Sequence, residues 1–133
     1  MDCIFCKISN GAVPCERIFE SSQILAFLDI SPLSEGHTLI VPKVHFEKLH
    51  EIPDTTLQEI LPLAKKIANA LGCSDYNLLQ NNGSFAHQAV RHAHFHIIPK
   101  TGPEGLKLSW NPIEQSAKKL AATGKRLREK LSV

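Results

Sequence analysis

The chain has 133 residues, of which 43% are hydrophobic and 21% charged, a composition typical of one compact globular domain. The net charge of +2 is too small to indicate nucleic-acid or membrane binding through bulk electrostatics. The sequence starts without a basic leader and an apolar segment, and no apolar run has the length of a membrane span. We therefore expect a cytoplasmic protein whose four cysteines are reduced.

In chain order, the apolar patterns predict five strands and a first long helix. The predicted strands are residues 16–20, 23–28, 37–41, 76–80 and 91–98. The first two strands flank Ser21-Ser22 and indicate a hairpin. Residues 54–72 have apolar residues at the three- and four-residue spacing of a helix. We expect Asp54 to cap this helix, Gly72 to end it and Pro62 to kink it.

The segment Asn111-Pro112-Ile113-Glu114 predicts the start of a second helix, because it offers an N-cap, a proline at the first helical position and a glutamate at the third. Basic residues gather towards the C-terminus, where they complement the dipole of this helix. The predicted fold is therefore α+β: one antiparallel five-stranded sheet with two helices packed on it.

Three histidines alternate along the last predicted strand. His92, His94 and His96 share one face, whereas the residues between them form an apolar face suited to a core. Titratable rings on a sheet face are costly to desolvate, and this indicates a functional site. Either the rings ligate a catalytic metal, or one neutral ring attacks an electrophile while its neighbours orient it. The spacing alone does not decide between these two chemistries.

Cys3-x-x-Cys6 has the spacing of half a zinc site, although two buried apolar thiols would give the same pattern. Cys15 and Cys73 lack partners at metal-binding spacing, and we interpret both as packing residues.

The segment Gln88–Ile98, with its His-x-His-x-His core, resembles the signature of the histidine triad family. The segments 3–8, 29–32 and 36–45 also resemble segments of this family, so the similarity spans residues 3 to about 110. The sequence is most similar to the Hint branch in its zinc-bearing form. This resemblance implies a single histidine triad domain over residues 1–133, with 111–133 as a C-terminal helical extension.

The resemblance implies hydrolysis or transfer at the α-phosphate of a purine nucleotide, such as a phosphoramidate or an adenylate. His94 would attack phosphorus and form a nucleotidyl-histidine intermediate, and the backbone carbonyl of His92 would hold its other ring nitrogen. His96 would donate to a phosphate oxygen or to the leaving group, Gln88 would contact the same oxygens, and His37 would hold the hydrogen-bond network.

The same resemblance implies a nucleotide pocket. Asp29 would accept from both ribose hydroxyls, although an aspartate before Ser31-Pro32 also suits a turn. Asn81 would reach the phosphate. Ala89 and His87 stand where relatives often have serine and glycine, which affects the leaving-group preference. The base would lie between apolar walls formed by Phe5, Ile8, Phe27, Ile30 and Leu39, of which Ile8 and Leu39 also suit the core.

Finally, the resemblance implies a structural zinc on Cys3, Cys6, His45 and His92, and a homodimer built by the 54–72 helix and the fourth strand. Two other functions stay open at this stage. The three histidines could ligate a catalytic zinc in a metal-dependent hydrolase, or the protein could be a nucleotide-binding regulator with little turnover.

Overall fold

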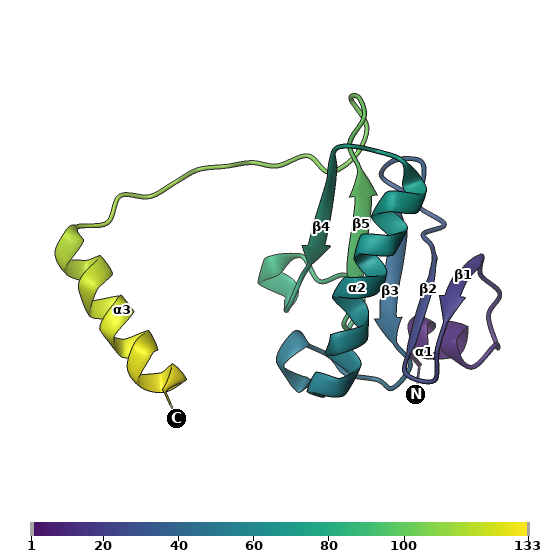
Figure 1. Cartoon of the computed structure of the whole chain (residues 1–133), viewed down its shortest axis with the longest axis horizontal. Helices are drawn as coiled ribbons and strands as arrows, with labels where there is room; N and C mark the ends of the chain where they lie inside the picture. Colours follow the sequence, from purple (N-terminus) through teal and green to yellow (C-terminus); the bar gives the residue numbers. More distant parts are fainter. Residues whose placement is uncertain (1, 133) are drawn as a thin grey trace.

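The computed structural model describes residues 2–132, and its compact part, on the right in Figure 1, is built on an antiparallel five-stranded sheet. The strands are β1 (Arg17–Glu20), β2 (Ile24–Leu28), β3 (Thr38–Pro42), β4 (Tyr76–Gln80) and β5 (Phe95–Pro99), in the order β1-β2-β3-β5-β4. The helices are α1 (Ile4–Ser9), α2 (Asp54–Leu71) and α3 (Ala117–Leu131), and short 3-10 turns lie at Leu49–Glu51 and Ser84–Ala86. The α+β prediction is confirmed, but the structure adds a third helix.

The sheet is covered on both faces by different helices. On one face, α2 packs its apolar stripe over β2, β3 and β5 and forms a buried core with Ala93, Phe95 and Ile97. On the other face, Phe5 and Ile8 of α1 pack against Phe27 and Leu39. The histidines that alternate with the core residues therefore turn towards the α1 side, as the strand pattern predicts.

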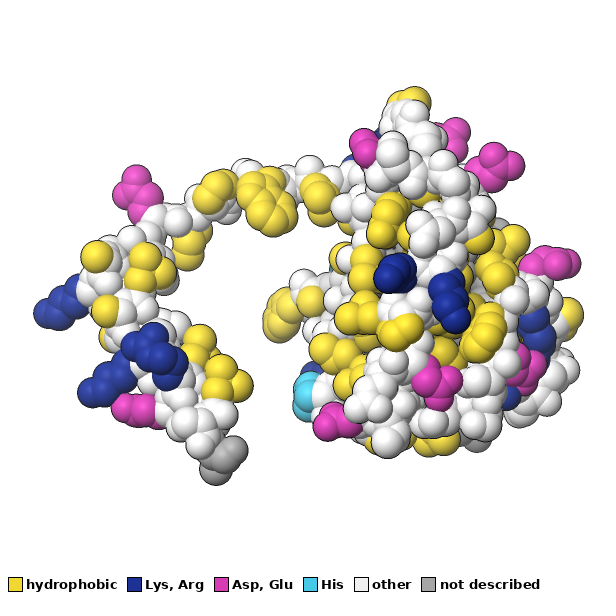
Figure 2. Space-filling model, in the orientation of Figure 1, with side chains coloured by type: hydrophobic (Ala, Val, Ile, Leu, Met, Phe, Trp, Pro, Cys, Tyr) yellow, Lys and Arg dark blue, Asp and Glu magenta, His cyan; other side chains and the backbone are white. Residues whose placement is uncertain are grey.

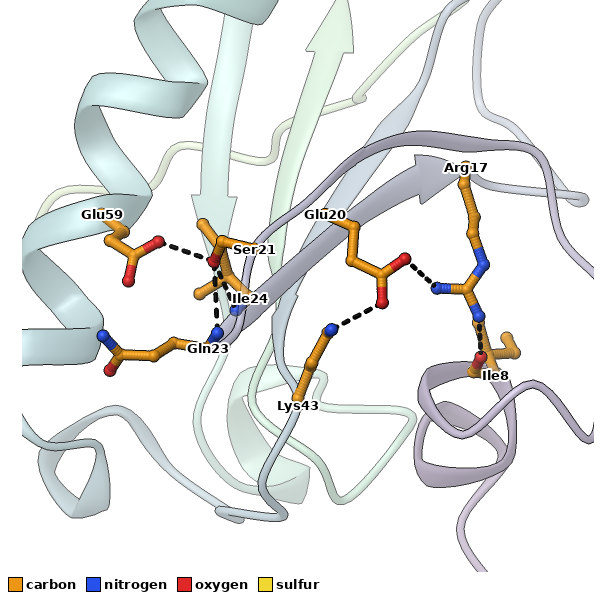
Figure 3. A network of polar contacts seen from close by, with 8 residues as sticks. All are labelled: Ile8, Arg17, Glu20, Ser21, Gln23, Ile24, Lys43 and Glu59. Carbon is orange, nitrogen blue, oxygen red and sulfur yellow. Dashed lines mark hydrogen bonds and ion pairs between the residues drawn. The ribbon is translucent and has the colours of Figure 1, made fainter.

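The short helix α1 has no counterpart among the predicted elements. A six-residue helix is too short to be stable alone, so tertiary contacts must hold it. Figure 3 shows one of these contacts, in which the Arg17 guanidinium donates to the carbonyl of Ile8 at 2.7 Å. The same guanidinium donates to Glu20, which also accepts from Lys43. This network joins α1 to the edge strand β1.

The last strand begins later than predicted, at Phe95 instead of residue 91. Its ladder with β3 ends at the pair Ile40–Phe95, and two residues further along β3 lies Pro42, which has no N–H to donate. Ala93 instead donates its N–H to the carbonyl of Phe46 at 2.7 Å. His92 and His94 therefore lie before β5, outside its ladder.

The predicted helix 54–72 is confirmed as α2, and Gly72 ends it in the left-handed conformation at φ 71°. Asp54 is the first helical residue and not the cap, because Pro53 occupies the N-cap position without a side-chain cap. Pro62 lies inside the helix on its exposed side.

The C-terminal helix begins at Ala117, five residues after Pro112, the predicted first helical residue, and does not pack on the sheet. Ser116 caps it by accepting from the N–H of Lys119. We name residues 107–132 the C-terminal arm and residues 2–106 the body. The arm stands away from the body (Figure 2), and among residues 2–132 no hydrogen bond joins the two. None of the described helices is long and apolar enough to cross a membrane.

Candidate active site

A cavity of about 360 Å³ lies between α1 and the histidine side of the sheet. It is mostly apolar, with two histidines and one carboxylate in its wall. Nine of the residues predicted for the site line it: Phe5, Ile8, Phe27, Asp29, Ile30, Leu39, Ala89, His94 and His96. An apolar cavity with a few polar groups has the character of a small-molecule site.

The sequence interpretation missed part of the wall. Seven further residues line the cavity: Ile4, Val13, Pro14, Cys15, Leu28, Ser31 and Val90. The helical spacing of Ile4 and Ile8 would have indicated the first of them. The loop 13–15 carries no periodic signal, and Cys15, interpreted as a packing residue, lies in this loop.

The ring of His94 is fixed in one orientation and one tautomer. Its Nδ1 lies 2.7 Å from the carbonyl oxygen of His92. A carbonyl only accepts, so Nδ1 carries the proton and donates it. Phe5 packs its ring edge-to-face against the imidazole at a centroid distance of 5.0 Å. In the neutral ring, Nε2 therefore keeps a lone pair.

A second chain of hydrogen bonds determines the proton positions of His37 and His96. The backbone N–H of Leu33 donates to Nδ1 of His37 at 3.0 Å, so the proton of a neutral His37 is on Nε2. That Nε2 lies 2.9 Å from Nδ1 of His96 and donates to it. His96 must then carry its own proton on Nε2 and can donate it to a ligand.

Burial keeps these rings neutral. Desolvation lowers the pKa of His37 and of His94 below the ordinary value of 6.5, although the nearby Asp29 carboxylate opposes the effect. Burial, together with repulsion from His94 and His37, lowers the pKa of His96 to about 4. At neutral pH the site therefore presents one lone pair, on His94, beside one N–H donor, on His96.

Asp29 lies at the turn after β2 and also lines the cavity. Its Oδ1 accepts from the N–H of Ser31 at 2.8 Å, which is the turn contact expected of an aspartate here. Its Oδ2 lies 3.6 Å from Nε2 of His37. One carboxylate oxygen thus supports the loop, while the other belongs to the histidine network.

Gln88 is buried, and each end of its amide makes one hydrogen bond. Its Oε1 accepts from the N–H of Gly83 at 2.7 Å, and its Nε2 donates to the carbonyl of Glu47 at 2.7 Å. The amide thus positions the loop before the triad. Its Nε2 has a second N–H, so the phosphate contact implied by the resemblance stays a prediction. Asn81 also supports this loop by donating to the carbonyl of His87 at 3.2 Å.

His87 is exposed and has a left-handed backbone, with φ at 66°. Of the residues that the structure describes, it is the one non-glycine with positive φ. Histidine adopts this conformation more readily than most residues, so the backbone accommodates it here.

Cys3, Cys6, His45 and His92 form a compact cluster beside the site, with one donor atom from each within 4.8 Å of the others. Nδ1 of His92 lies 3.4 Å from Sγ of Cys3 and 3.6 Å from Sγ of Cys6, and Nδ1 of His45 lies 3.5 Å from Sγ of Cys6. Tetrahedral zinc bonds would separate sulfur and nitrogen ligands by about 3.5 Å. Nε2 of His92 donates to the carbonyl of Pro42 at 2.8 Å, so Nδ1 is free of protons. The donor set therefore fits zinc.

A second group, Asp29, His37 and His96, also brings three possible ligand atoms together. A metal on Nε2 of His37 would have to displace the proton that the Leu33 N–H confines to that atom. The tautomer therefore favours a hydrogen-bond chain here. Neither ligand group found among residues 2–132 contains His94, which disfavours a catalytic zinc on the three triad histidines.

Three known proteins are similar to nearly the whole chain. The chain is 48% identical to the adenosine 5'-monophosphoramidase of Schizosaccharomyces pombe, over 98% of this chain and 99% of that protein. It is also 48% identical to the protein of the same name from Saccharomyces cerevisiae, over 97% of this chain and 82% of that protein. A crystal structure of the histidine triad nucleotide-binding protein from Candida albicans is 43% identical, with a TM-score of 0.93 and 98% of both chains covered.

Comparison with models of protein families gives a match over the central part of the chain. The HIT domain model matches residues 10–102, which include the triad and most of the cavity wall. The chain therefore belongs to the histidine triad, or HIT, family.

Proposed function

We propose that this protein is an enzyme that hydrolyses adenosine 5'-phosphoramidates and related purine nucleotides at the α-phosphate. The observation that carries the proposal is the buried His94 ring, with Nδ1 fixed by a carbonyl and a lone pair on Nε2 beside the cavity. The names of the relatives from both yeasts support the same activity.

The reaction proceeds in two steps. In the first, Nε2 of His94 attacks phosphorus, the bond from phosphorus to the leaving nitrogen breaks, and the amine leaves with a proton taken from solvent. The Nε2–H of His96 hydrogen-bonds to the leaving group as this bond lengthens. In the second, water attacks phosphorus, the bond to His94 breaks, and the proton returns to solvent. The products are the amine and the nucleoside monophosphate.

The test measures release of adenosine monophosphate from adenosine 5'-phosphoramidate by the wild-type protein and by His94→Ala. The variant is expected to bind nucleotide but to lose turnover by at least about a thousandfold, because the covalent route is gone. The control is His50→Asn, an exposed histidine in the 3-10 turn after β3. Mass spectrometry of acid-free quenched reactions is expected to detect the nucleotidyl group on His94. Activity of His94→Ala within tenfold of wild type would contradict the assignment, and binding without turnover by the wild type would favour a regulator.

The proposal includes a structural zinc on Cys3, Cys6, His45 and His92. Four protein ligands would close the site, so the ion would supply cross-linking and no open coordination position. It would join α1, the loop after β3 and the segment before β5. His92 would then bind the ion through its ring while its carbonyl orients His94.

The proposal also includes a homodimer across the α2 and β4 side of the sheet. β4 is an edge strand, and its Tyr76 and Leu78 are 43% and 45% exposed. Leu78 pairs with Ile97, a core residue under α2, so it points to the helix side of the sheet. Exposed apolar residues on an edge strand favour pairing with a second copy.

A further inference from the structure

The proposed reaction needs a proton for the leaving amine, and the buried histidines are poor sources of it. An amine that departs from phosphorus keeps the electron pair of the broken bond, so it must gain a proton. Burial lowers the pKa of His37 and of His94, and burial with repulsion from neighbouring rings lowers the pKa of His96 to about 4, so all three rings are neutral at neutral pH. A neutral imidazole donates a hydrogen bond but does not readily give up its remaining proton. An acid supplied by the protein must therefore be another group.

His87 lies on the loop that joins β4 to the triad segment, beside the active-site cavity. Leu79 of β4 pairs with His96, and Asn81 follows two residues later, so alternation places the Asn81 side chain on the histidine face of the sheet. The Asn81 amide donates to the carbonyl of His87 at 3.2 Å. Ala89, at the other end of the loop, lines the cavity together with two of the triad rings. Both ends of the loop therefore hold His87 at the margin of the site.

The ring of His87 is free and close to the triad. It is exposed, and among residues 2–132 no hydrogen bond or ion pair involves its side chain. Burial, His94 and His37 lower the pKa of His96 most, and repulsion from His87 lowers it further. The charge of His87 thus acts on the ring whose N–H would contact the leaving group.

The backbone at position 87 also indicates a role for this side chain. Its φ of 66° lies in the left-handed region, which glycine adopts at less cost. The N–H of His87 donates to the carbonyl of Ser84 at 3.0 Å, and the N–H of Gln88 donates to that of Gly83 at 3.0 Å, so the loop holds this conformation. A titratable ring therefore occupies a position where the backbone favours glycine, and such an outlier beside an active site indicates function.

The loop separates two groups of charged and titratable side chains. On its outer side lies a cavity of about 130 Å³ that shares no residue with the active-site cavity. The charged residues that line this outer cavity are Glu47, Lys48 and Arg91. The titratable groups on the active-site side are Asp29, His37, His94 and His96. The basic side chains therefore lie across the loop from the nucleotide, which leaves His87 as the acid at this margin.

We propose that His87 is the general acid that protonates the leaving amine. This role rests on the proposed function, since it specifies the source of a proton in that reaction. In the first step, Nε2 of His94 forms its bond to phosphorus, and the bond from phosphorus to the leaving nitrogen breaks. The electron pair stays on this nitrogen and takes the proton of the His87 imidazolium, which becomes neutral imidazole. In the second step, the neutral ring accepts a proton from the attacking water and is charged again.

The test compares two substrates that differ in the leaving group. Adenosine 5'-phosphoramidate releases ammonia, which needs a proton, whereas the 4-nitrophenyl ester of adenosine monophosphate releases a phenolate, which does not. His87→Asn removes the acid and keeps a side chain that tolerates the left-handed backbone. It is expected to lower kcat/KM by about a hundredfold for the phosphoramidate and by less than about threefold for the ester. The control, His50→Asn, changes another exposed histidine and is expected to behave as wild type on both substrates.

A dependence on pH distinguishes proton transfer from support of the loop. The ratio of wild-type to His87→Asn activity on the phosphoramidate is expected to be largest near about pH 6 and to shrink towards about pH 9, because a neutral ring has no acidic proton to give. Added imidazole is expected to restore part of the phosphoramidate hydrolysis of His87→Gly, since it replaces the missing acid. Circular dichroism and melting temperatures check that both variants fold as wild type.

The remaining outcomes separate the role of His87 from the proposed function. An equal loss on both substrates would show that His87 only supports the loop, and no loss on either would show that its ring takes no part. Both results overturn the general acid and leave the nucleophile His94 in place. A wild type without activity on the phosphoramidate, or a fully active His94→Ala, would overturn both proposals.

Discussion

The proton positions at the active site follow from which atoms can only donate and which can only accept. The Leu33 N–H makes Nδ1 of His37 an acceptor, and the His92 carbonyl makes Nδ1 of His94 a donor. The lone pair on His94 and the N–H on His96 are therefore in place before any ligand binds. A site prepared in this way needs little reorganisation when charge develops on phosphate.

The lowered pKa of His96 predicts a loss of stability in acid. Its pKa is about 4 in the folded protein and 6.5 ordinarily, so between these values the unfolded chain binds a proton that the native chain does not. The free energy of unfolding therefore falls as the pH drops from 6.5 towards 4. Urea titrations at pH 7 and pH 5 measure the free energy of unfolding at each pH. Between these two values it is expected to fall by about 2 kcal/mol less in His96→Asn than in wild type. An equal loss in both proteins would show that His96 does not contribute.

Asp29 is predicted to select ribose. Loss of one hydroxyl from a bound sugar would leave a carboxylate acceptor without a partner, at a cost of about 1 to 3 kcal/mol. Calorimetry is therefore expected to show adenosine monophosphate binding at least about fivefold better than its 2'-deoxy form. Asp29→Asn is expected to reduce this preference while its Oδ1 keeps the turn contact to Ser31, and Asp75→Asn serves as an exposed control. Equal binding of both sugars to wild type would leave Asp29 as a turn residue only.

Among the elements, β5 and the segment before it contribute both to the core and to the wall of the cavity. Alternation places Ala93, Phe95 and Ile97 in the core and the histidines on the cavity side, and this division could be predicted from the sequence. The start of the strand could not be, because it depends on Pro42, which lies on a different strand. The start of α3 at Ala117 could not be predicted either. Asn111 and Ser116 both suit an N-cap, and no packing contact distinguishes them.

The Cys and His cluster predicts about one zinc ion per chain. Elemental analysis after chelator-free purification measures it, and Cys6→Ala is expected to lose the metal while Cys73→Ala retains it. Burial and the adjacent Cys3 raise the pKa of the Cys6 thiol, so metal binding must displace protons and affinity is expected to fall as the pH falls. Chelation is expected to lower the melting temperature of wild type, because α1 is anchored through this cluster. A metal-free wild type of unchanged stability would exclude a structural role.

At the scale of the whole molecule, periodicity predicted the sheet, the long helix and the apolar and polar sides of the triad. It could not predict the cavity wall contributed by the loop 13–15, which has no repeating pattern. Nor could it show that the amide of Gln88 joins Gly83 to Glu47, since only the fold brings these two residues together. The sequence periodicity thus predicted which faces of the strands and of the long helix are buried. The partners of each polar side chain depend on contacts between residues that are distant in the sequence.

Three ring protons in this protein are assigned by main-chain groups: the Pro42 carbonyl for His92, the His92 carbonyl for His94 and the Leu33 amide for His37. A substitution at position 42 or 92 keeps the main-chain carbonyl, because every amino acid has one. The carbonyl would therefore still hold the ring proton on the same nitrogen of its histidine. The positions of these three ring protons therefore depend on the course of the backbone. At position 33, proline alone among the twenty amino acids lacks the amide hydrogen. Only proline there would remove the hydrogen bond that fixes the tautomer of His37 and, through it, that of His96.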